Sequence, residues 1–125
     1  MRKFYKCNRC GNLLTPILDS GLTPVCCGEQ MTVLTANTVD AAKEKHVPVI
    51  ERDGQKISVA VGSVAHPMTE EHYIQFIAIE QASKVQIVTL SSSDEPTAKF
   101  VVCDPDAPVT AYEFCNLHGL WSAEG

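Results

Sequence analysis

The feature that most constrains this chain is the placement of its cysteines. Four of the six lie within the first 27 residues, as Cys7-x2-Cys10 and the adjacent pair Cys26-Cys27, and a glycine follows each pair. A segment this short cannot build a sufficient hydrophobic core and usually needs a metal or a disulfide as a staple. We therefore expect residues 1–36 to form a small domain organised around these four side chains.

The redox setting favours a metal over disulfides. The first residues contain no apolar stretch typical of a secretory signal, and no apolar run is long enough to cross a membrane. We expect a cytoplasmic protein, where thiols stay reduced and clustered cysteines more often bind metal. Two intervening residues let Cys7 and Cys10 bind one ion, whereas the adjacent Cys26 and Cys27 chelate at a strained angle. The pattern predicts a distorted four-thiolate site for zinc or iron.

Charge and composition exclude other classes. The chain of 125 residues carries 15 acidic and 10 basic side chains, a net charge of −5, which argues against nucleic acid as a partner. A hydrophobic fraction of 45% is sufficient for a globular core in residues 37–125, the second expected domain.

From about residue 47 the pattern is typical of β-structure. Apolar residues alternate or cluster between turn-rich pieces, and we expect strands at 57–61, 72–80, 85–90, 99–102 and 109–115. Shorter strands are expected at 4–6, 12–18 and 30–35, and one or two helical turns between residues 36 and 45, capped by Asn37 or Thr38. The chain is predicted to be all-β, with an antiparallel sandwich after the cysteine-rich segment.

The four histidines form a second group. His46, His66, His72 and His118 all stand beside turns, and Cys115-x2-His118 lies at the end of an expected strand. One such histidine alone is most often an ordinary hydrogen-bonded residue. Four imidazoles and one thiolate would leave an octahedral metal one open position, and an open position is typical of a reactive site.

Two charged residues precede the first of these histidines. Lys45 is placed to attract a small anion to the open position, and Glu44 to ligate or hydrogen-bond the oxidised metal. The alternative for both is an exposed helix end with paired charges.

These residues, taken together, strongly resemble the desulfoferrodoxin family, the two-iron superoxide reductases. The front part resembles desulforedoxin in its four cysteines. The back part resembles the neelaredoxin-type catalytic domain in Glu44-Lys45-His46-Val47-Pro48, in Gly62 to Met68, in Glu71-His72 and in Cys115-Asn116-Leu117-His118-Gly119. One departure is Leu120, where relatives often have histidine before the position of Trp121. No ligand role attaches to that position.

The resemblance implies two irons per chain. Cys7, Cys10, Cys26 and Cys27 would hold the first, and the second would have His46, His66, His72 and His118 in a plane with Cys115 as the axial ligand. It also implies an immunoglobulin-like seven-stranded sandwich, a homodimer, one-electron reduction of superoxide to hydrogen peroxide in oxidative-stress defence, and a small electron donor such as rubredoxin. Cys103 matches no ligand, and we expect it to be a buried free thiol.

Two other functions would explain part of the pattern. A pure electron-transfer protein of the blue-copper type needs one cysteine, two histidines and a weak axial methionine, yet no methionine follows Cys115. More generally, an electron-transfer metalloprotein without superoxide turnover is the alternative to the reductase. A zinc-stapled interaction module would explain the front cysteines but would leave four histidines without a role.

Overall fold

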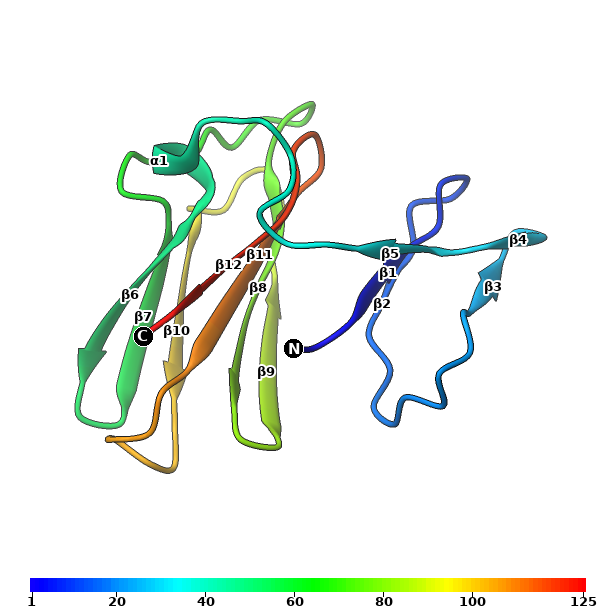
Figure 1. Cartoon of the computed structure of the whole chain (residues 1–125). Coiled ribbons are helices and arrows are strands. Elements are labelled where there is room, and N and C mark those ends of the chain that lie inside the picture. The colour runs from blue at the N-terminus through cyan, green and yellow to red at the C-terminus, as the bar shows by residue number, and fades with distance from the viewer. The chain divides into compact units, whose positions relative to one another are not determined.

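The computed structural model describes all 125 residues, and the chain forms two compact units, residues 1–35 and 36–125 (Figure 1). Both are built almost entirely from antiparallel strands, as the sequence predicts. The one helix, α1 (Lys43–His46), has four residues, so no helix is long enough to cross a membrane.

The first unit consists of two very small sheets. In one, β1 (Phe4–Lys6) pairs with β2 (Leu13–Leu14) on one side and with β5 (Thr32–Leu34) on the other; in the second, β3 (Val25–Cys26) and β4 (Glu29–Gln30) form a hairpin. Its buried cluster joins Tyr5, Cys7 and Met31, with Cys26 packed against them. Since two of these four residues are candidate metal ligands, the apolar packing available without them is minimal.

The strand expected at residues 12–18 is much shorter than predicted. β2 ends at Leu14 because Pro16 has no N–H to donate to a ladder. The Thr15 hydroxyl donates to the carbonyl of Lys3 at 2.8 Å, and Arg2 donates to the Pro16 carbonyl at 3.2 Å. Side-chain hydrogen bonds thus replace the strand pairing beyond Leu14.

The expected helix cap is also wrong. Ala42 precedes α1 and provides no side-chain cap. Asn37 instead has a positive φ of 62°, and its side-chain oxygen accepts the N–H of Ser122 at 3.0 Å. Asn37 therefore serves to tie the start of the second unit to a strand at its C-terminus.

The second unit is a sandwich of seven strands. β6 (Pro48–Asp53), β7 (Lys56–Val61) and β10 (Thr97–Val101) form one sheet in the order β10-β7-β6, and β8 (Ile74–Gln81), β9 (Lys84–Thr89), β11 (Thr110–Cys115) and β12 (Gly119–Glu124) form the other in the order β12-β11-β8-β9. The sandwich predicted from the resemblance is confirmed. Two strands, β6 and the final strand β12, were not among those expected from the pattern, because neither segment has a clear alternation of apolar and polar residues.

The core lies between the two sheets. The inward residues of each sheet are fully or nearly fully buried and include Ile57, Val59, Val61, Ile74, Ile77, Ile79, Phe100, Val109, Ala111 and Cys115. The expected alternation at 57–61 is confirmed, since Ile57, Val59 and Val61 are buried while Ser58 and Ala60 are half-buried. Cys115 thus belongs both to the core and to the end of β11.

A single guanidinium closes the end of the sandwich that holds the C-terminus. Arg52 on β6 donates to the carbonyls of Ala107 at 2.7 Å, Pro105 at 2.9 Å and Gly125 at 3.1 Å. Its planar fork is suited to several acceptors at once. It therefore joins the 104–107 loop and the last residue to β6.

This clamp gives the first prediction. Replacing Arg52 by Met keeps the apolar stem but removes every donor, and hydrogen bonds to a charged group contribute about 1.5–3 kcal/mol. We expect Arg52→Met to lower the free energy of unfolding by about 2 kcal/mol, measured from the urea midpoint. Lys99→Met, an exposed lysine on β10, is the matched control and should change it by less than about 0.5 kcal/mol. Equal effects of the two substitutions would contradict the clamp.

Candidate metal centres

Five metal-binding side chains meet at one end of the sandwich. His46 ends α1, His66 and His72 lie in the loop between β7 and β8, Cys115 ends β11, and His118 lies in the turn before β12. In Figure 1 these segments gather at the end of the sandwich that carries α1. One ligand atom from each residue lies within 4.8 Å of all the others.

The four imidazoles form a closed cycle of edge-on contacts. The ring centroids of His46 and His66 are 4.8 Å apart, those of His66 and His72 4.6 Å, those of His72 and His118 5.1 Å, and those of His118 and His46 4.8 Å. Neighbouring rings are inclined at 75° to 85°. Such a cycle surrounds one common centre, and the arrangement differs from a blue-copper site, which uses only two histidines.

Backbone carbonyls select which nitrogen faces that centre. The Nδ1 atom of His46 lies 2.7 Å from the carbonyl of Ala42, and the Nδ1 atom of His66 lies 2.7 Å from the carbonyl of Pro67. Each Nδ1 therefore carries the proton and donates it, which leaves Nε2 with a free lone pair. This is the usual way in which a protein orients an imidazole toward a metal.

The other donors complete the set. The Nε2 atoms of His66 and His72 are buried and have no hydrogen-bond partner. His118 turns its other nitrogen inward, with Nδ1 at 3.1 Å from His46 Nε2 and 3.9 Å from Cys115 Sγ. Buried polar atoms in proteins nearly always have a hydrogen-bond partner. The unpartnered Nε2 atoms of His66 and His72 therefore fit a bound cation.

Burial prepares these groups for a cation. It lowers the pKa of His46 and of His72, and it lowers the pKa of His66 to about 4, so all three rings are neutral near pH 7. It also raises the pKa of the Cys115 thiol. A coordinated cation reverses that last effect, because a thiol bound to a metal is deprotonated.

A β-bulge positions the thiol. The pairing of β11 with β8 shifts between Phe114 and Cys115, so that Phe114 pairs with Phe76 but Cys115 pairs with Ile74. Bulges re-aim side chains beside functional sites. Here the shift falls on the one strand residue that belongs to the cluster.

Glu44 and Lys45 lie on the rim, and a glycine anchors their backbone. A Cβ on Gly62 would stand 2.7 Å from the carbonyl oxygen of Glu44 and 3.1 Å from the N–H of His46. That carbonyl also accepts the N–H of Val64 at 2.8 Å. The close approach therefore requires glycine at position 62. The side chains of Glu44 and Lys45 remain exposed.

The charge on Lys45 acts on the cluster. After burial and neighbouring imidazoles, the Lys45 ammonium is a further cause of the lowered pKa of His46 and of His72. An ammonium that disfavours protonation of these rings also attracts an anion to the same place.

Two residues beside the cluster were not found from the sequence. Trp121 stacks on His46, with ring centroids 5.2 Å apart, and donates its Nε1–H to the carbonyl of His118 at 3.0 Å. Glu113 shares the inward face of β11 with Ala111 and Cys115, and neither of its carboxyl oxygens has a partner. Burial raises the pKa of Glu113 to about 9, so it is neutral near pH 7. The signal that could have pointed to Trp121 and Glu113 is that both lie close to Cys115 and His118 along the chain.

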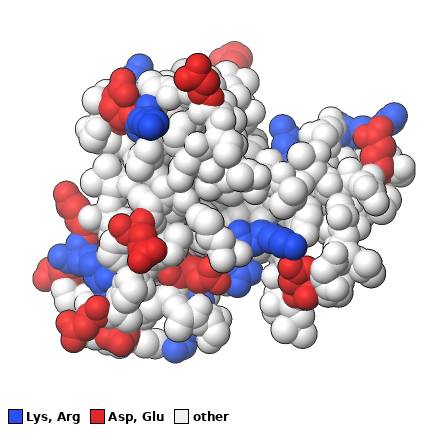
Figure 2. Space-filling view, viewed as in Figure 1, with Lys and Arg blue, Asp and Glu red and all other residues white.

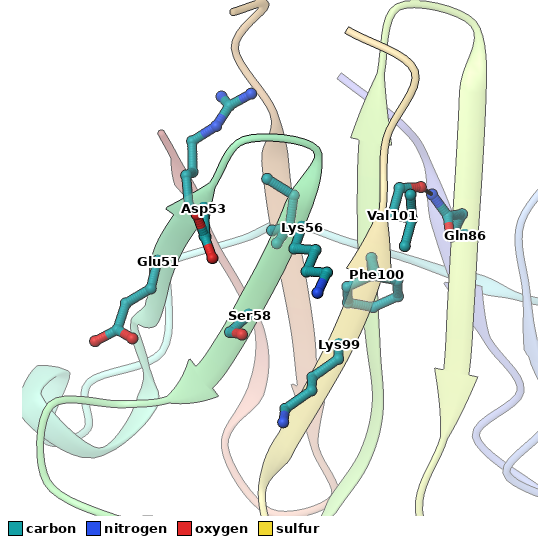
Figure 3. Close-up of a pocket in the computed structure, with 10 residues that line it drawn as sticks. Glu51, Asp53, Lys56, Ser58, Gln86, Lys99, Phe100 and Val101 are labelled. Carbon is teal, nitrogen blue, oxygen red and sulfur yellow. Dashed lines mark hydrogen bonds between the residues drawn. The ribbon is translucent and has the colours of Figure 1, made fainter. Parts of the chain in front are cut away.

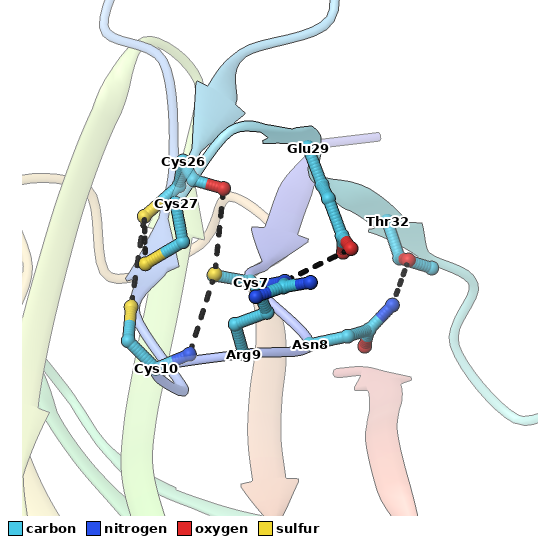
Figure 4. Close-up of polar contacts among 8 residues, drawn as sticks. All are labelled: Cys7, Asn8, Arg9, Cys10, Cys26, Cys27, Glu29 and Thr32. Atoms are coloured by element: carbon cyan, nitrogen blue, oxygen red, sulfur yellow. Dashed lines mark hydrogen bonds and ion pairs between the residues drawn. The ribbon is translucent and has the colours of Figure 1, made fainter.

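The four front cysteines also converge, on a second candidate centre (Figure 4). Cys10 Sγ is 3.6 Å from Cys26 Sγ, which is 3.9 Å from Cys27 Sγ, and the four sulfurs lie within 4.8 Å of one another. The adjacent pair can share one centre because Cys27 and Gly28 both have positive φ, 53° and 76°. Every cysteine is a free thiol, so the disulfide alternative is wrong.

The front thiols cannot all ionise by themselves. The Cys10 N–H, as the main cause, lowers the pKa of Cys7 to about 6, whereas hydrogen bonding to Cys10 raises the pKa of Cys26 and raises that of Cys27 to about 12. Four sulfurs this close therefore need a cation to be thiolates together. Beside them Arg9 forms an exposed ion pair with Glu29 at 2.9 Å (Figure 4).

One prediction about the cysteines is wrong. Cys103 is exposed rather than buried. Val102 is the residue that faces the core, and Cys103 follows it into the loop after β10, so its side chain points to solvent.

A shallow hollow elsewhere on the second unit is lined by no metal-binding histidine or cysteine. It lies on the outer face of the sheet of β6, β7 and β10, where Glu51, Ser58 and Lys99 form a row across neighbouring strands and Asp53 lies beside Lys56 (Figure 3). The hollow therefore lacks the metal-binding side chains that meet at the end of the sandwich carrying α1.

Known proteins share this organisation. The family model described as "Desulfoferrodoxin, N-terminal domain" matches residues 1–34, and the one described as "Desulfoferrodoxin" matches residues 38–124. A desulfoferrodoxin of Syntrophotalea carbinolica is 50% identical over 121 residues, covering 97% of this chain and 94% of that protein.

Solved structures agree. The superoxide reductase from Treponema pallidum has a TM-score of 0.81 and 40% identity, with 98% of both chains covered. The superoxide reductase (1Fe-SOR) from Giardia intestinalis has a TM-score of 0.60 and 33% identity, and covers 66% of this chain and 98% of its own. From the two family models and these likenesses, the chain belongs to the desulfoferrodoxin family.

Proposed function

We propose that this protein is a superoxide reductase that protects against oxidative stress by one-electron reduction of superoxide to hydrogen peroxide. The observation that carries the proposal is the closed cycle of four imidazoles with one thiol among them, in a member of the desulfoferrodoxin family. Relatives with matching folds bear the name superoxide reductase. A purely structural metal site would not explain five donors with a charged, exposed rim.

The residues fit two iron ions per chain. His46, His66, His72, His118 and Cys115 would hold one, and Cys7, Cys10, Cys26 and Cys27 the other. When bound at the first of these sites, ferrous iron supplies the single electron that superoxide needs, and two protons from water complete hydrogen peroxide. The protein holds neutral imidazoles in place through the carbonyls of Ala42 and Pro67.

Lys45 draws the substrate to the site. The second unit has six basic and thirteen acidic side chains, a formal net charge of −7, so the unit as a whole does not attract a small anion. The face drawn in Figure 2 shows acidic and basic groups interspersed, without one broad basic patch. Screening limits such fields to about 10 Å, so the exposed ammonium beside the site and the cation within it dominate locally.

Glu44 and the front domain have supporting roles. We assign to Glu44 an interaction with the oxidised centre, since its backbone is anchored beside His46 while its side chain is free to turn. Residues 1–36 would carry the four-thiolate iron and residues 37–125 the catalytic centre. Because Cys10 and Cys27 are exposed, a small electron donor such as rubredoxin can approach the front iron closely. We further propose a cytoplasmic homodimer.

The iron content tests the two centres separately. Cys27→Ser removes one thiolate from the exposed side of the front site, so we expect metal analysis to show a fall from two irons per chain to one. The thiolate-to-ferric absorption of the front centre should vanish, and the rate with superoxide should persist. Two zinc ions per wild-type chain would contradict the assignment of both sites.

Steering by Lys45 is tested by kinetics. Lys45→Ala removes the ammonium next to the cluster, and we expect the second-order rate with pulse-generated superoxide to fall about tenfold at low salt. The difference should shrink as salt is added. Lys84→Ala, at the exposed first residue of β9, is the control and should leave the rate unchanged. A Lys45 variant with the wild-type rate at low salt would refute the steering role.

The role of Glu44 is tested by spectroscopy of the resting oxidised protein. Glu44→Ala should still react with superoxide, because no donor of the cluster is lost, but its absorption spectrum should shift. Glu71→Ala, next to His72 and also exposed, serves as the control for loss of a nearby charge. If the spectra of Glu44→Ala and wild type coincide, Glu44 does not interact with the oxidised centre.

A further inference from the structure

Two of the four imidazoles are oriented through their own rings, because His46 and His66 each donate a hydrogen bond from Nδ1 to a backbone carbonyl. His72 makes no such contact, and the inward Nδ1 of His118 lies 3.1 Å from His46 Nε2, where both atoms face the centre. The Nε2 atom of His72 has no partner. Its orientation must therefore depend on how its backbone is held.

His72 lies outside the regular strands, two positions before Ile74, the first residue of β8. A turn fixes it on one side. Its N–H donates to the carbonyl of Thr69 at 3.2 Å, and the Thr69 N–H donates to the carbonyl of His72 at 3.0 Å. These bonds define the turn, but they connect His72 only to its own loop.

The side-chain amide of Asn116 forms hydrogen bonds with both chain neighbours of His72. Asn116 donates from Nδ2 to the carbonyl of Glu71 at 3.0 Å, and its Oδ1 accepts the N–H of Tyr73 at 2.9 Å. Its backbone N–H also donates to the carbonyl of Tyr73 at 3.2 Å. Only an amide offers a donor and an acceptor at this spacing, since aspartate has no donor and alanine has neither.

We propose that Asn116 is a positioning residue for the second iron centre, and that its amide clamps the backbone on both sides of His72. The inference rests on the proposed function, because it takes the five donors as iron ligands. Asn116 directly follows Cys115, so the clamp ties His72 to the turn that carries Cys115 and His118. The clamp thus fixes the backbone of His72 relative to that of Cys115.

The test uses the full chain loaded with iron. Asn116→Ala removes both side-chain bonds, and loss of such an orienting partner typically weakens metal affinity about 10- to 100-fold. We expect this loss for the second iron, measured in the reduced protein by competition with a ferrous chelator. The absorption of the front centre is an internal control and should be unchanged. Should this variant fail to fold, Asn116→Asp, which keeps the acceptor for Tyr73, is used in its place.

A matched control separates positioning from stability. Gln81, at the far end of β8, is also an amide that clamps a loop, since Nε2 donates to the carbonyl of Asp104 at 2.8 Å and Oε1 accepts its N–H at 3.2 Å. Gln81→Ala should destabilise folding to a similar degree and leave the affinity for the second iron unchanged. That contrast supports the proposal.

Two results would overturn the inference alone: wild-type iron affinity in Asn116→Ala, or an equal loss of affinity in Gln81→Ala. A wild-type protein that holds no iron at the second site would overturn the proposed function as well. The outcomes are distinguishable because chelator competition measures binding directly, without superoxide.

Discussion

The metal centre of the second unit depends on buried imidazole nitrogens that have no protein partner. Nε2 of His66 and Nε2 of His72 are both removed from water and unpaired, and the Cys115 thiol is fully buried. Such atoms cost free energy unless something satisfies them, and a cation satisfies all of them at once. Burial lowers the pKa of His46, His66 and His72, so these three rings are neutral near pH 7 and their lone pairs are available. The same burial that would destabilise the empty centre therefore prepares it for iron.

The two centres are built by opposite means. In the first unit the strands have two or three residues, and half of the small core consists of cysteine ligands. The metal is therefore expected to contribute folding energy there directly. In the second unit a sandwich with its own apolar core already exists, and the ligands project from its end. A reactive centre benefits from this, because its geometry is then supported by the scaffold as well as by the bound ion.

Much of the candidate site could be predicted from the sequence. Cys-x2-Cys and Cys-x2-His are local patterns, because their ligands are close enough along the chain for spacing to report geometry. The histidines before β8 were recognised as a set with Cys115, and the structure does bring them together. Three local predictions were wrong. Pro16 shortens the strand expected at residues 12–18, a tertiary hydrogen bond to Ser122 occupies Asn37 in place of the helix cap, and Cys103 follows the core-facing Val102 into an exposed loop. The supporting residues Asn116, Trp121 and Glu113 carry no pattern of their own.

The sequence by itself determined three things about the protein: a group of four cysteine ligands and a second group of four histidines with one cysteine, an all-β fold, and the family to which the chain belongs. Those properties depend on residue type and on spacing along the chain, which a sequence displays directly. Only the tertiary structure decided which ring nitrogen faces the centre, that the four imidazoles form a closed cycle, and that Asn116 brackets His72 from 44 positions away. These features arise from contacts between distant segments, and such contacts depend on strand register, a bulge and burial, none of which a local pattern specifies.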